Sequence, residues 1–226
     1  MDMDDQSRAF VRKLLIWYKK AARSLPWRET RNPYAILVSE FMLQQTQVSR
    51  VLEYFPRFMA RFPTIAKLAR ARPKAVMEEW DGLGYYARAR NLHTLARHVT
   101  RRHDGTLPDD PVELRTLPGV GPYTAGAVAC FAYEKAVPAV DTNVRRVLQR
   151  AFAPKDVWEF AGSLTPRNGK RAWKFNQALM ELGALVCTAR KPRCPECPVK
   201  NNCRTFASFE TPSPRAKQAA RKSRQL

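Results

Sequence analysis

The sequence predicts an all-α fold. Apolar residues recur at helical spacing along most of the chain, and the alternating pattern of a half-buried strand is scarce. Prolines separate the helical stretches at intervals that fit helices of ordinary length joined by short turns. Glycine makes up only 9 of the 226 residues, which suits helices and argues against a glycine-rich nucleotide-binding architecture.

The composition predicts a soluble, intracellular protein that binds nucleic acid. Lys and Arg total 40 against 20 Asp and Glu, a formal net charge of +20, and neutralising phosphates with such charge releases counterions. A surface charged only for solubility is the alternative, although ~2–8 net charges are enough for that. Only six of the basic residues follow Cys203, so the folded body is itself basic. The chain has no apolar run of the ~18 residues that cross a membrane. We expect a DNA-associated monomer, in the cytoplasm or nucleoid if the source is prokaryotic.

The first predicted helices precede residue 63, and one of them holds a candidate acid. Residues 35–43 form a strongly apolar helix with a single ionisable group, Glu40. Burial would raise the pKa of this carboxyl and favour its protonated form, which a general acid needs near neutral pH. A surface glutamate or a structural ion pair is the alternative interpretation. The apolar residues that predict the two flanking helices are Phe10, Leu14, Leu15, Tyr18, Val51, Tyr54, Phe55, Phe58 and Phe62.

Residues 117–127 (LPGVGPYTAGA) predict a hairpin that leads into a helix of small residues. Gly119 and Gly121 let the backbone adopt a positive φ and let its N–H groups approach an anion closely. The partial positive charge at the start of the next helix favours the same anion. In a basic chain this pattern indicates a contact with one DNA phosphate that reads no sequence; an ordinary helix-turn-helix connection is the alternative. Cys130, in the following apolar run, is expected to be a buried small hydrophobe.

Asp141 is predicted to cap the helix that begins at Thr142. The helix terminus and nearby arginines are expected to keep its carboxylate ionised, which is the state needed to stabilise a developing cation. Capping alone is the alternative. Together, a protonated Glu40 and an ionised Asp141 are the two carboxyl states that cleave glycosidic bonds through oxocarbenium-like states.

Four of the five cysteines form the array Cys187-x6-Cys194-x2-Cys197-x5-Cys203. Disulfides are rare inside cells, so this spacing predicts a metal site. Tetrahedral zinc sites more often show two C-x2-C pairs, whereas one pair with longer arms suits a bulkier cluster held by four thiolates. The spacing favours an iron–sulfur cluster and leaves zinc open.

Taken in order, these motifs resemble the helix-hairpin-helix DNA glycosylases of the endonuclease III type, and within them the adenine DNA glycosylases of the MutY type. The similarity runs from about residue 25 to residue 203. The matching segments are 25–28 (LPWR), 33–34 (PY), 39–48 (SEFMLQQTQV), 82–91 (GLGYYARARN), 117–121 (LPGVG), 140–144 (VDTNV), 175–177 (FNQ) and the cysteine array. The resemblance implies two helical lobes, with a C-terminal loop that binds a [4Fe-4S] cluster through Cys187, Cys194, Cys197 and Cys203.

The resemblance also implies the catalytic residues. Glu40 matches the acid that protonates the departing base and then helps to activate water. Asp141 matches the carboxylate that stabilises the sugar cation or is transiently attacked by it, with Asn143 in the same motif. Tyr123 stands where bifunctional relatives carry a Schiff-base lysine, so we expect weak strand cleavage and a monofunctional glycosylase.

A base inside the duplex must be extruded into a pocket before it is attacked. The resemblance indicates which residues contact the DNA and which form the pocket. Arg88 is included among the DNA contacts because it brings positive charge close to Tyr85. The residues predicted to contact DNA are Gln44, Gln45, Thr46, Tyr85, Arg88, Gly119, Val120 and Gly121. The residues predicted to form the adenine pocket are Trp27, Arg28, Leu43, Val48 and Gln177. Core packing is the alternative for Trp27, Leu43 and Val48.

We expect residues 27–136 to form a six-helix lobe with Glu40 and the hairpin, residues 1–26 and 137–203 to form the cluster-bearing lobe with Asp141, and residues 204–226 to be a basic flexible tail. The predicted reaction is hydrolysis of the N-glycosidic bond of adenine opposite guanine or 8-oxoguanine in double-stranded DNA, a step of base excision repair.

Two alternatives stay open. One is removal of thymine or uracil from mismatches with guanine, and the other is a non-catalytic DNA-binding protein. Relatives of the MutY type carry a further C-terminal domain that reads 8-oxoguanine, and the 23 residues after Cys203 are too few to form it. The preferred opposite base is therefore left open as well.

Overall fold

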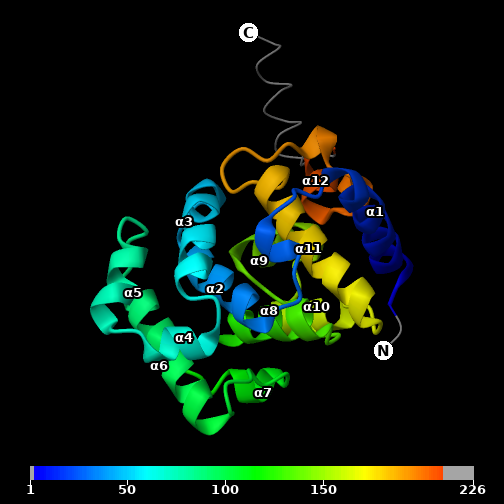
Figure 1. Ribbon diagram of the computed structural model, residues 1–226. Helices are drawn as coiled ribbons and strands as arrows, with labels where there is room; N and C mark the ends of the chain where they lie inside the picture. The colour runs from blue at the N-terminus through cyan, green and yellow to red at the C-terminus, as the bar shows by residue number, and fades with distance from the viewer. Residues whose placement is uncertain (1–2, 211–226) are drawn as a thin grey trace, which may run out of the picture. The chain divides into compact units, whose positions relative to one another are not determined.

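The computed structural model describes residues 3–210, and these residues form helices and connecting segments without a strand (Figure 1). The all-α prediction is confirmed. The α-helices are α1 (Asp5–Ala21), α2 (Pro33–Leu43), α3 (Val48–Arg61), α4 (Ile65–Arg70), α5 (Pro73–Trp80), α6 (Ala87–Arg102), α7 (Pro111–Leu114), α8 (Pro122–Tyr133), α9 (Thr142–Phe152), α10 (Val157–Leu164), α11 (Gly169–Leu185) and α12 (Arg204–Glu210). The 3-10 helices are η1 (Pro26–Arg28), η2 (Cys194–Glu196) and η3 (Lys200–Asn202).

The described residues divide into two compact units. Unit 1 draws them from the ranges Met1–Ala22, Val140–Pro166 and Lys174–Leu226, and unit 2 from Arg23–Ala139 and Arg167–Trp173. The chain therefore passes between the units four times, and α11 begins in one unit and ends in the other.

Side-chain caps and prolines determine where the helices begin. The side chains of Asn32 and Asp156, for example, each accept two hydrogen bonds from backbone N–H groups of the helix that follows. Prolines open α2, α5, α7 and α8, where a missing N–H costs nothing. Pro56 is an exception to the expectation that prolines separate helices, because it lies inside α3. Pro56 and Leu52 are both exposed, so water can reach the Leu52 carbonyl that lost its helical partner.

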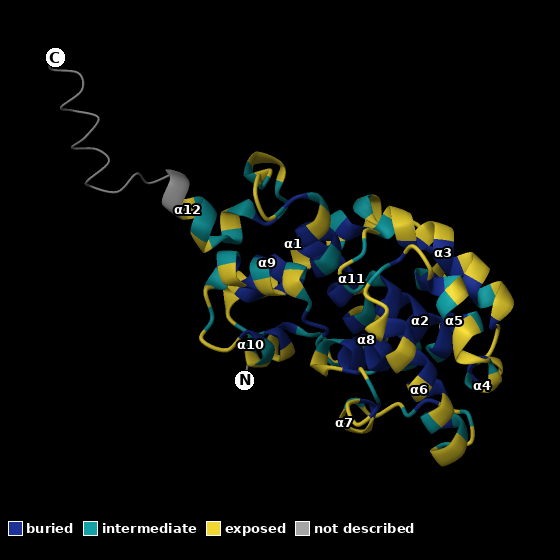
Figure 2. Ribbon diagram, turned by 90° about the vertical axis from the view of Figure 1, so that its left-hand side faces the viewer, coloured by how far each residue is buried: buried dark blue, intermediate teal, exposed yellow. Residues whose placement is uncertain are grey.

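Helices α2 and α8 form the core of unit 2. Every residue from Tyr34 to Met42 on α2 is buried, as is every residue from Thr124 to Phe131 on α8 (Figure 2). The two helices pack against each other, as expected of helices that are apolar on all sides. A Cβ on Gly126 would lie 2.3 Å from the carbonyl oxygen of Pro138, so only glycine allows this close approach. This packing carries Glu40 into the interior.

Unit 1 is held together by aromatic contacts and by bonds between its two ends. The ring centroids of Phe10 on α1 and Phe152 on α9 are 5.0 Å apart in an edge-to-face arrangement. The Lys13 ammonium donates to Asn202 Oδ1 at 2.9 Å, which ties α1 to the cysteine-bearing segment. Thr205 on α12 donates through its hydroxyl to the carbonyl of Arg150 on α9 at 2.7 Å.

Two expectations about element structure need correction. Unit 2 contains seven α-helices, α2 to α8, where six were expected, because the short α7 forms ahead of the hairpin. The start of the expected flexible tail is helical, since Arg204–Glu210 form α12 and pack against α9. The rest of that predicted tail, residues 211–226, lies outside the described residues.

Candidate functional site

Glu40 and Tyr123 come together in the core of unit 2. Only 5% of the Glu40 surface is exposed, and the Tyr123 hydroxyl on α8 donates to Glu40 Oε2 on α2 at 2.6 Å. Because α2 and α8 pack directly against each other, this distance is set by the core and not by mobile loops. Glu40 is therefore a buried carboxyl with a fixed donor at one oxygen.

The hairpin between α7 and α8 depends on Gly119. Its φ is +77°, and a Cβ at this position would lie 2.8 Å from Asn91 Cβ and 3.1 Å from the Phe41 ring. The hairpin therefore packs its tip against α6 and α2 in a conformation that favours glycine.

The other two hairpin residues differ from expectation. Gly121 has φ −89° and ψ 178° at the N-cap of α8, so it does not use the positive φ that the sequence suggested. It is exposed, with no atom near the place of a Cβ. Val120 is buried, and its N–H donates to the Leu117 carbonyl at 3.1 Å. The Val120 side chain therefore faces the core and its N–H already has a partner, so these observations do not support its expected contact with DNA, which stays a prediction.

The residues predicted to enter the duplex lie on two short loops of unit 2. Gln45, after α2, is exposed with φ +56°, and Tyr85, before α6, is 59% exposed with φ +49°. Residues with a Cβ rarely adopt these values. Gln44 and Thr46 flank Gln45 and are half-buried. Each loop thus presents a side chain to solvent from a strained backbone.

Arg88 does not have the exposed position that a phosphate contact requires. It is 7% exposed, and its guanidinium donates to backbone carbonyls and to one hydroxyl within unit 2. Burial lowers the pKa of Arg88 below its ordinary value, and arginine nevertheless keeps its charge in proteins. Its donors are already used inside the fold, so this geometry does not favour the expected contact of Arg88 with DNA, which stays a prediction.

The predicted pocket residues divide between the two units. In unit 2, Trp27 is buried with its ring edge-to-face against Phe55 at 5.4 Å, and Arg28 is half-buried and donates to the Arg23 carbonyl at 3.2 Å. Leu43 and Val48 are half-buried at the end of α2 and the start of α3. Gln177 belongs to unit 1, where it is buried on α11.

Asp141 caps α9 as predicted. Its Oδ1 accepts from the Val144 N–H at 2.7 Å, and its Oδ2 accepts from the Asn143 amide at 2.9 Å. Burial nevertheless raises the pKa of Asp141 above its ordinary value, against these hydrogen bonds and the nearby Arg146. The helix terminus and nearby arginines were expected to keep this carboxylate ionised, and desolvation acts against them as the largest effect on its pKa.

Arg146 links Asp141 to the cysteine segment through Asn143. Its guanidinium donates to Asn143 Oδ1 at 2.7 Å, to the Gly183 carbonyl at 2.7 Å and to the Cys187 carbonyl at 2.8 Å. Arg146 is not among the residues predicted from the sequence. The signal was available, because Arg146 and Arg150 are four residues apart and so share one face of α9.

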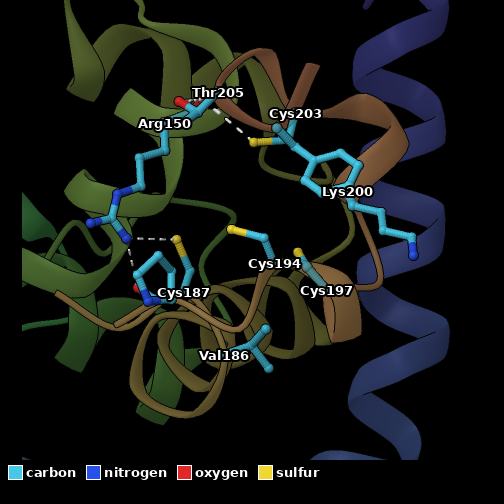
Figure 3. Close-up of a pocket in the computed structure, with 10 residues that line it drawn as sticks. Arg150, Val186, Cys187, Cys194, Cys197, Lys200, Cys203 and Thr205 are labelled. Carbon is cyan, nitrogen blue, oxygen red and sulfur yellow. Dashed lines mark hydrogen bonds between the residues drawn. The ribbon is translucent and has the colours of Figure 1, made fainter. Parts of the chain in front are cut away.

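The four cysteines of the array line one pocket of about 130 Å³ in unit 1 (Figure 3). The pocket is also lined by Arg150, Val186, Pro192, Lys200, Thr205 and Phe206. The Arg150 guanidinium lies 3.4 Å from Cys187 Sγ and donates to the carbonyls of Thr188 and Ala189. Arg150 thus brings a positive charge to the place where thiolates would collect negative charge.

These thiols fit a polynuclear cluster better than a single ion. Figure 3 shows their sulfur atoms around an open space, and no three His, Cys, Asp or Glu side chains in the described part of the chain are placed to hold one metal ion. Burial raises the pKa of the Cys197 thiol to about 11. Metal binding displaces the proton of such a thiol. The donor set of four sulfurs is that of iron–sulfur clusters.

None of the described helices is both long and apolar enough to cross a membrane.

Comparison with known proteins gives two family matches within the chain. Residues 38–159 match the family model "HhH-GPD superfamily base excision DNA repair protein", and residues 187–203 match "Iron-sulfur binding domain of endonuclease III". The second match confirms the predicted iron–sulfur cluster at the four cysteines.

Curated relatives share much of this chain. The chain is 50% identical over 197 residues to the adenine DNA glycosylase of Mycobacterium tuberculosis, and the alignment covers 82% of this chain and 64% of the relative. It is 43% identical over 221 residues to the adenine DNA glycosylase of Homo sapiens, and that alignment covers 89% of this chain and 40% of the relative. The chain therefore spans less than two thirds of the length of these relatives.

Solved structures share the fold. A thermostable thymine-DNA glycosylase has a TM-score of 0.84 at 31% identity, with 90% of this chain and 97% of that chain covered. A non-covalent endonuclease III–DNA complex has a TM-score of 0.79 at 26% identity, with 93% and 99% covered. Because the family model spans more than half of the chain and these folds agree, the protein belongs to the HhH-GPD superfamily of base excision DNA repair proteins.

Proposed function

We propose that the chain is a monofunctional DNA glycosylase that removes adenine from mispairs with guanine or 8-oxoguanine. The buried Glu40, with its fixed Tyr123 donor, is the observation that carries this proposal. A carboxyl enclosed in an apolar core serves no structural need that an apolar residue would not meet better, but it suits proton transfer to a base in a water-poor site. The names of the curated relatives support adenine as that base.

The proposed reaction uses two carboxyl groups in sequence. Glu40 gives its proton to the departing adenine as the bond between the base and C1′ of the sugar breaks, which leaves positive charge on the sugar. The Asp141 carboxylate stabilises this cation. Water then adds to C1′ and returns a proton to Glu40, so that the products are free adenine and an abasic site.

The remaining residues position the substrate in this proposal. The exposed Gly121 and the first turn of α8 contact a phosphate, while Gln45 and Tyr85 enter the space left by the extruded base. The cysteine segment, which binds the cluster, holds the exposed Lys191 and Arg193 for contact with the DNA backbone.

A base-release assay tests the proposal. Duplexes that contain A·8-oxoG, A·G, T·G or U·G are incubated with the protein, and abasic sites are then cleaved with alkali. We expect cleavage at adenine. Release of thymine or uracil alone would favour the second reaction, which the likeness to a thymine-DNA glycosylase supports, and no release from any duplex would favour a non-catalytic DNA-binding protein.

Substitution of the proposed acid tests its role directly. We expect Glu40→Gln to reduce the single-turnover excision rate by about 10²–10⁴-fold, the usual contribution of a general acid, because the amide cannot give up a proton. Affinity for the mismatched duplex is expected to persist. Excision at an unreduced rate would show that another group is the acid.

A further inference from the structure

Arg88 joins two loops of unit 2 through one guanidinium. On one side, its Nη1 donates to the carbonyls of Phe41 at 3.1 Å, Met42 at 2.8 Å and Gln44, and its Nη2 donates to Thr46 Oγ1 at 3.0 Å. On the other side, Nη2 donates to the carbonyls at positions 83 and 84, at 3.1 Å and 3.0 Å. No ion pair to Arg88 occurs among the described residues, so its partners are neutral oxygens.

The first set of acceptors is the end of the helix that carries Glu40. Helix α2 ends at Leu43, and the carbonyls of its last turn lack partners within the helix. Arg88 supplies donors to two of them, at Phe41 and Met42, directly after Glu40. A positive charge at this end also complements the helix dipole. Arg88 thus acts as a C-terminal cap that comes from another helix, α6.

The second feature is strain in the loops that Arg88 connects. Gln45 and Tyr85 both have positive φ although both carry a Cβ. Such conformations persist only where the surroundings hold them. Bonds from Arg88 bracket Gln45 at Gln44 and Thr46, and they hold Gly84 next to Tyr85. The arginine also lies over the Tyr85 ring, with its Cζ 5.4 Å from the ring centroid.

We propose that Arg88 is a positioning residue that fixes the Gln45 loop and the Tyr85 loop together on the Glu40 helix, so that both enter the duplex as one unit during base extrusion. This inference rests on the proposed glycosylase function. The two loops act together because a single guanidinium holds both of them.

Substitution of Arg88 by lysine tests this role. Lysine keeps the charge but offers three donors from one point, so it cannot reach acceptors on two loops at once. The readout is the fluorescence of 2-aminopurine placed opposite guanine, which rises when the base leaves the stack. To prevent excision, the substitution is made in the Glu40→Gln protein, and fluorescence is measured at saturating protein. We expect Arg88→Lys to remove at least half of the rise.

Excision supplies a second readout. In the otherwise native protein, we expect Arg88→Lys to lower the single-turnover rate by about 10²-fold, the effect of a misplacement of about 1 Å. Affinity for an undamaged duplex, helical circular dichroism and the cluster absorbance are expected to stay within twofold of the native values. A purely structural role would move these three quantities, whereas a positioning role moves extrusion and rate.

Arg97→Lys is the matched control. Arg97 is exposed on the same helix, nine residues further along, and its substitution makes the same chemical change. We expect native fluorescence and native rate. A full fluorescence rise in the Arg88→Lys protein would overturn the proposal. If the proposed function itself is wrong, the Glu40→Gln parent shows no rise, so the two failures are distinguishable.

A measurement on the native protein covers the case in which Arg88→Lys does not fold. The Nε–H of a guanidinium held by seven acceptors exchanges slowly with solvent. Nuclear magnetic resonance of 15N-labelled protein is expected to show exchange at least tenfold slower for Arg88 than for Arg97. Equal exchange rates would contradict the proposal.

Discussion

Tyr123 has two separable properties at the scale of a single residue. Its ring takes part in the packing of α8, and its hydroxyl donates to Glu40 Oε2 at 2.6 Å. From the sequence, Tyr123 is notable only because it stands where bifunctional relatives carry a lysine. The structure adds a positive role, since the hydroxyl holds the carboxyl in one orientation inside the core.

Tyr123→Phe removes this hydroxyl and keeps the ring. We expect the single-turnover excision rate to fall by about 10–100-fold, because the hydroxyl stabilises the carboxylate that forms as Glu40 gives up its proton, and a hydrogen bond to a charged group is worth about 1.5–3 kcal/mol. Tyr133→Phe is the control, since that hydroxyl on the same helix donates to the Leu107 carbonyl at 2.5 Å, outside the Glu40 site. Equal loss in both variants would indicate a general effect on α8.

Asp141 predicts a pH dependence of stability. Burial raises its pKa in the folded protein, so the folded state binds the proton more tightly than the unfolded state does. The resulting contribution to the free energy of unfolding is fully present below the ordinary value of 3.8 and is lost as pH rises through the folded pKa. The amide in Asp141→Asn does not titrate, so the stability of this variant does not change with the ionisation of residue 141.

We therefore expect the melting temperature of Asp141→Asn, relative to that of the native protein, to increase between pH 4 and pH 7. Thermal unfolding followed by circular dichroism measures this difference. A relative decrease over the same range would mean that hydrogen bonds, and not burial, control the Asp141 pKa.

What the sequence reveals at this scale depends on how unusual a residue is in its neighbourhood. Glu40 is conspicuous because it is the one ionisable group in an apolar helix, and its burial follows from that pattern. Arg88 lies in a polar segment and looks like an exposed cation, yet it is buried. Its burial depends on where the α2 and α6 ends meet, and that is set by tertiary packing, which local pattern does not encode.

The hairpin between α7 and α8 shows how one element combines folding and binding. Gly119 is required by its positive φ and by its contact with Asn91, whereas Gly121 adopts a backbone conformation open to any residue. The sequence predicted the hairpin but treated the two glycines alike. The structure separates them, because only one of them is tightly packed.

Alanine substitutions are expected to divide these roles. Gly119→Ala should lower the free energy of unfolding by at least about 1–2 kcal/mol, from the left-handed backbone alone, as measured by urea titration. Gly121→Ala should leave the unfolding midpoint unchanged. It should weaken binding to an undamaged duplex about fivefold, the equivalent of one hydrogen bond, because a Cβ hinders the close approach of a phosphate to the backbone N–H groups. Unchanged DNA affinity of Gly121→Ala would argue against a phosphate contact at the hairpin.

Among larger elements, long apolar helices were predicted well and short ones were not. Helices α2 and α8 follow directly from their continuous apolar runs. The four residues of α7 and the seven of α12 are too short for periodicity to be informative. They are stabilised instead by an Asp110 cap and by the Thr205 hydrogen bond to α9.

For the whole molecule, the net charge of +20 predicts how DNA affinity depends on salt. We expect the affinity for undamaged duplex to fall about 10³-fold between 50 and 200 mM salt, the value for roughly six phosphate contacts. Filter binding or fluorescence anisotropy measures the slope. Removal of residues 211–226 should change it little, because only five of the 40 basic residues lie there. Loss of most of the slope would place the contacts in that segment.

The four passages of the chain between the units have a consequence for biosynthesis. Unit 2 takes most of its residues from the continuous range 23–139 and can fold while the rest of the chain is still on the ribosome. Unit 1 needs both ends, since Lys13 bonds to Asn202 across 189 positions. The cysteines at positions 187–203 also emerge last. We therefore expect cluster insertion to come late in maturation, and in a nascent chain starved of iron we expect unit 2 to be folded while the N-terminal helix still lacks its partner.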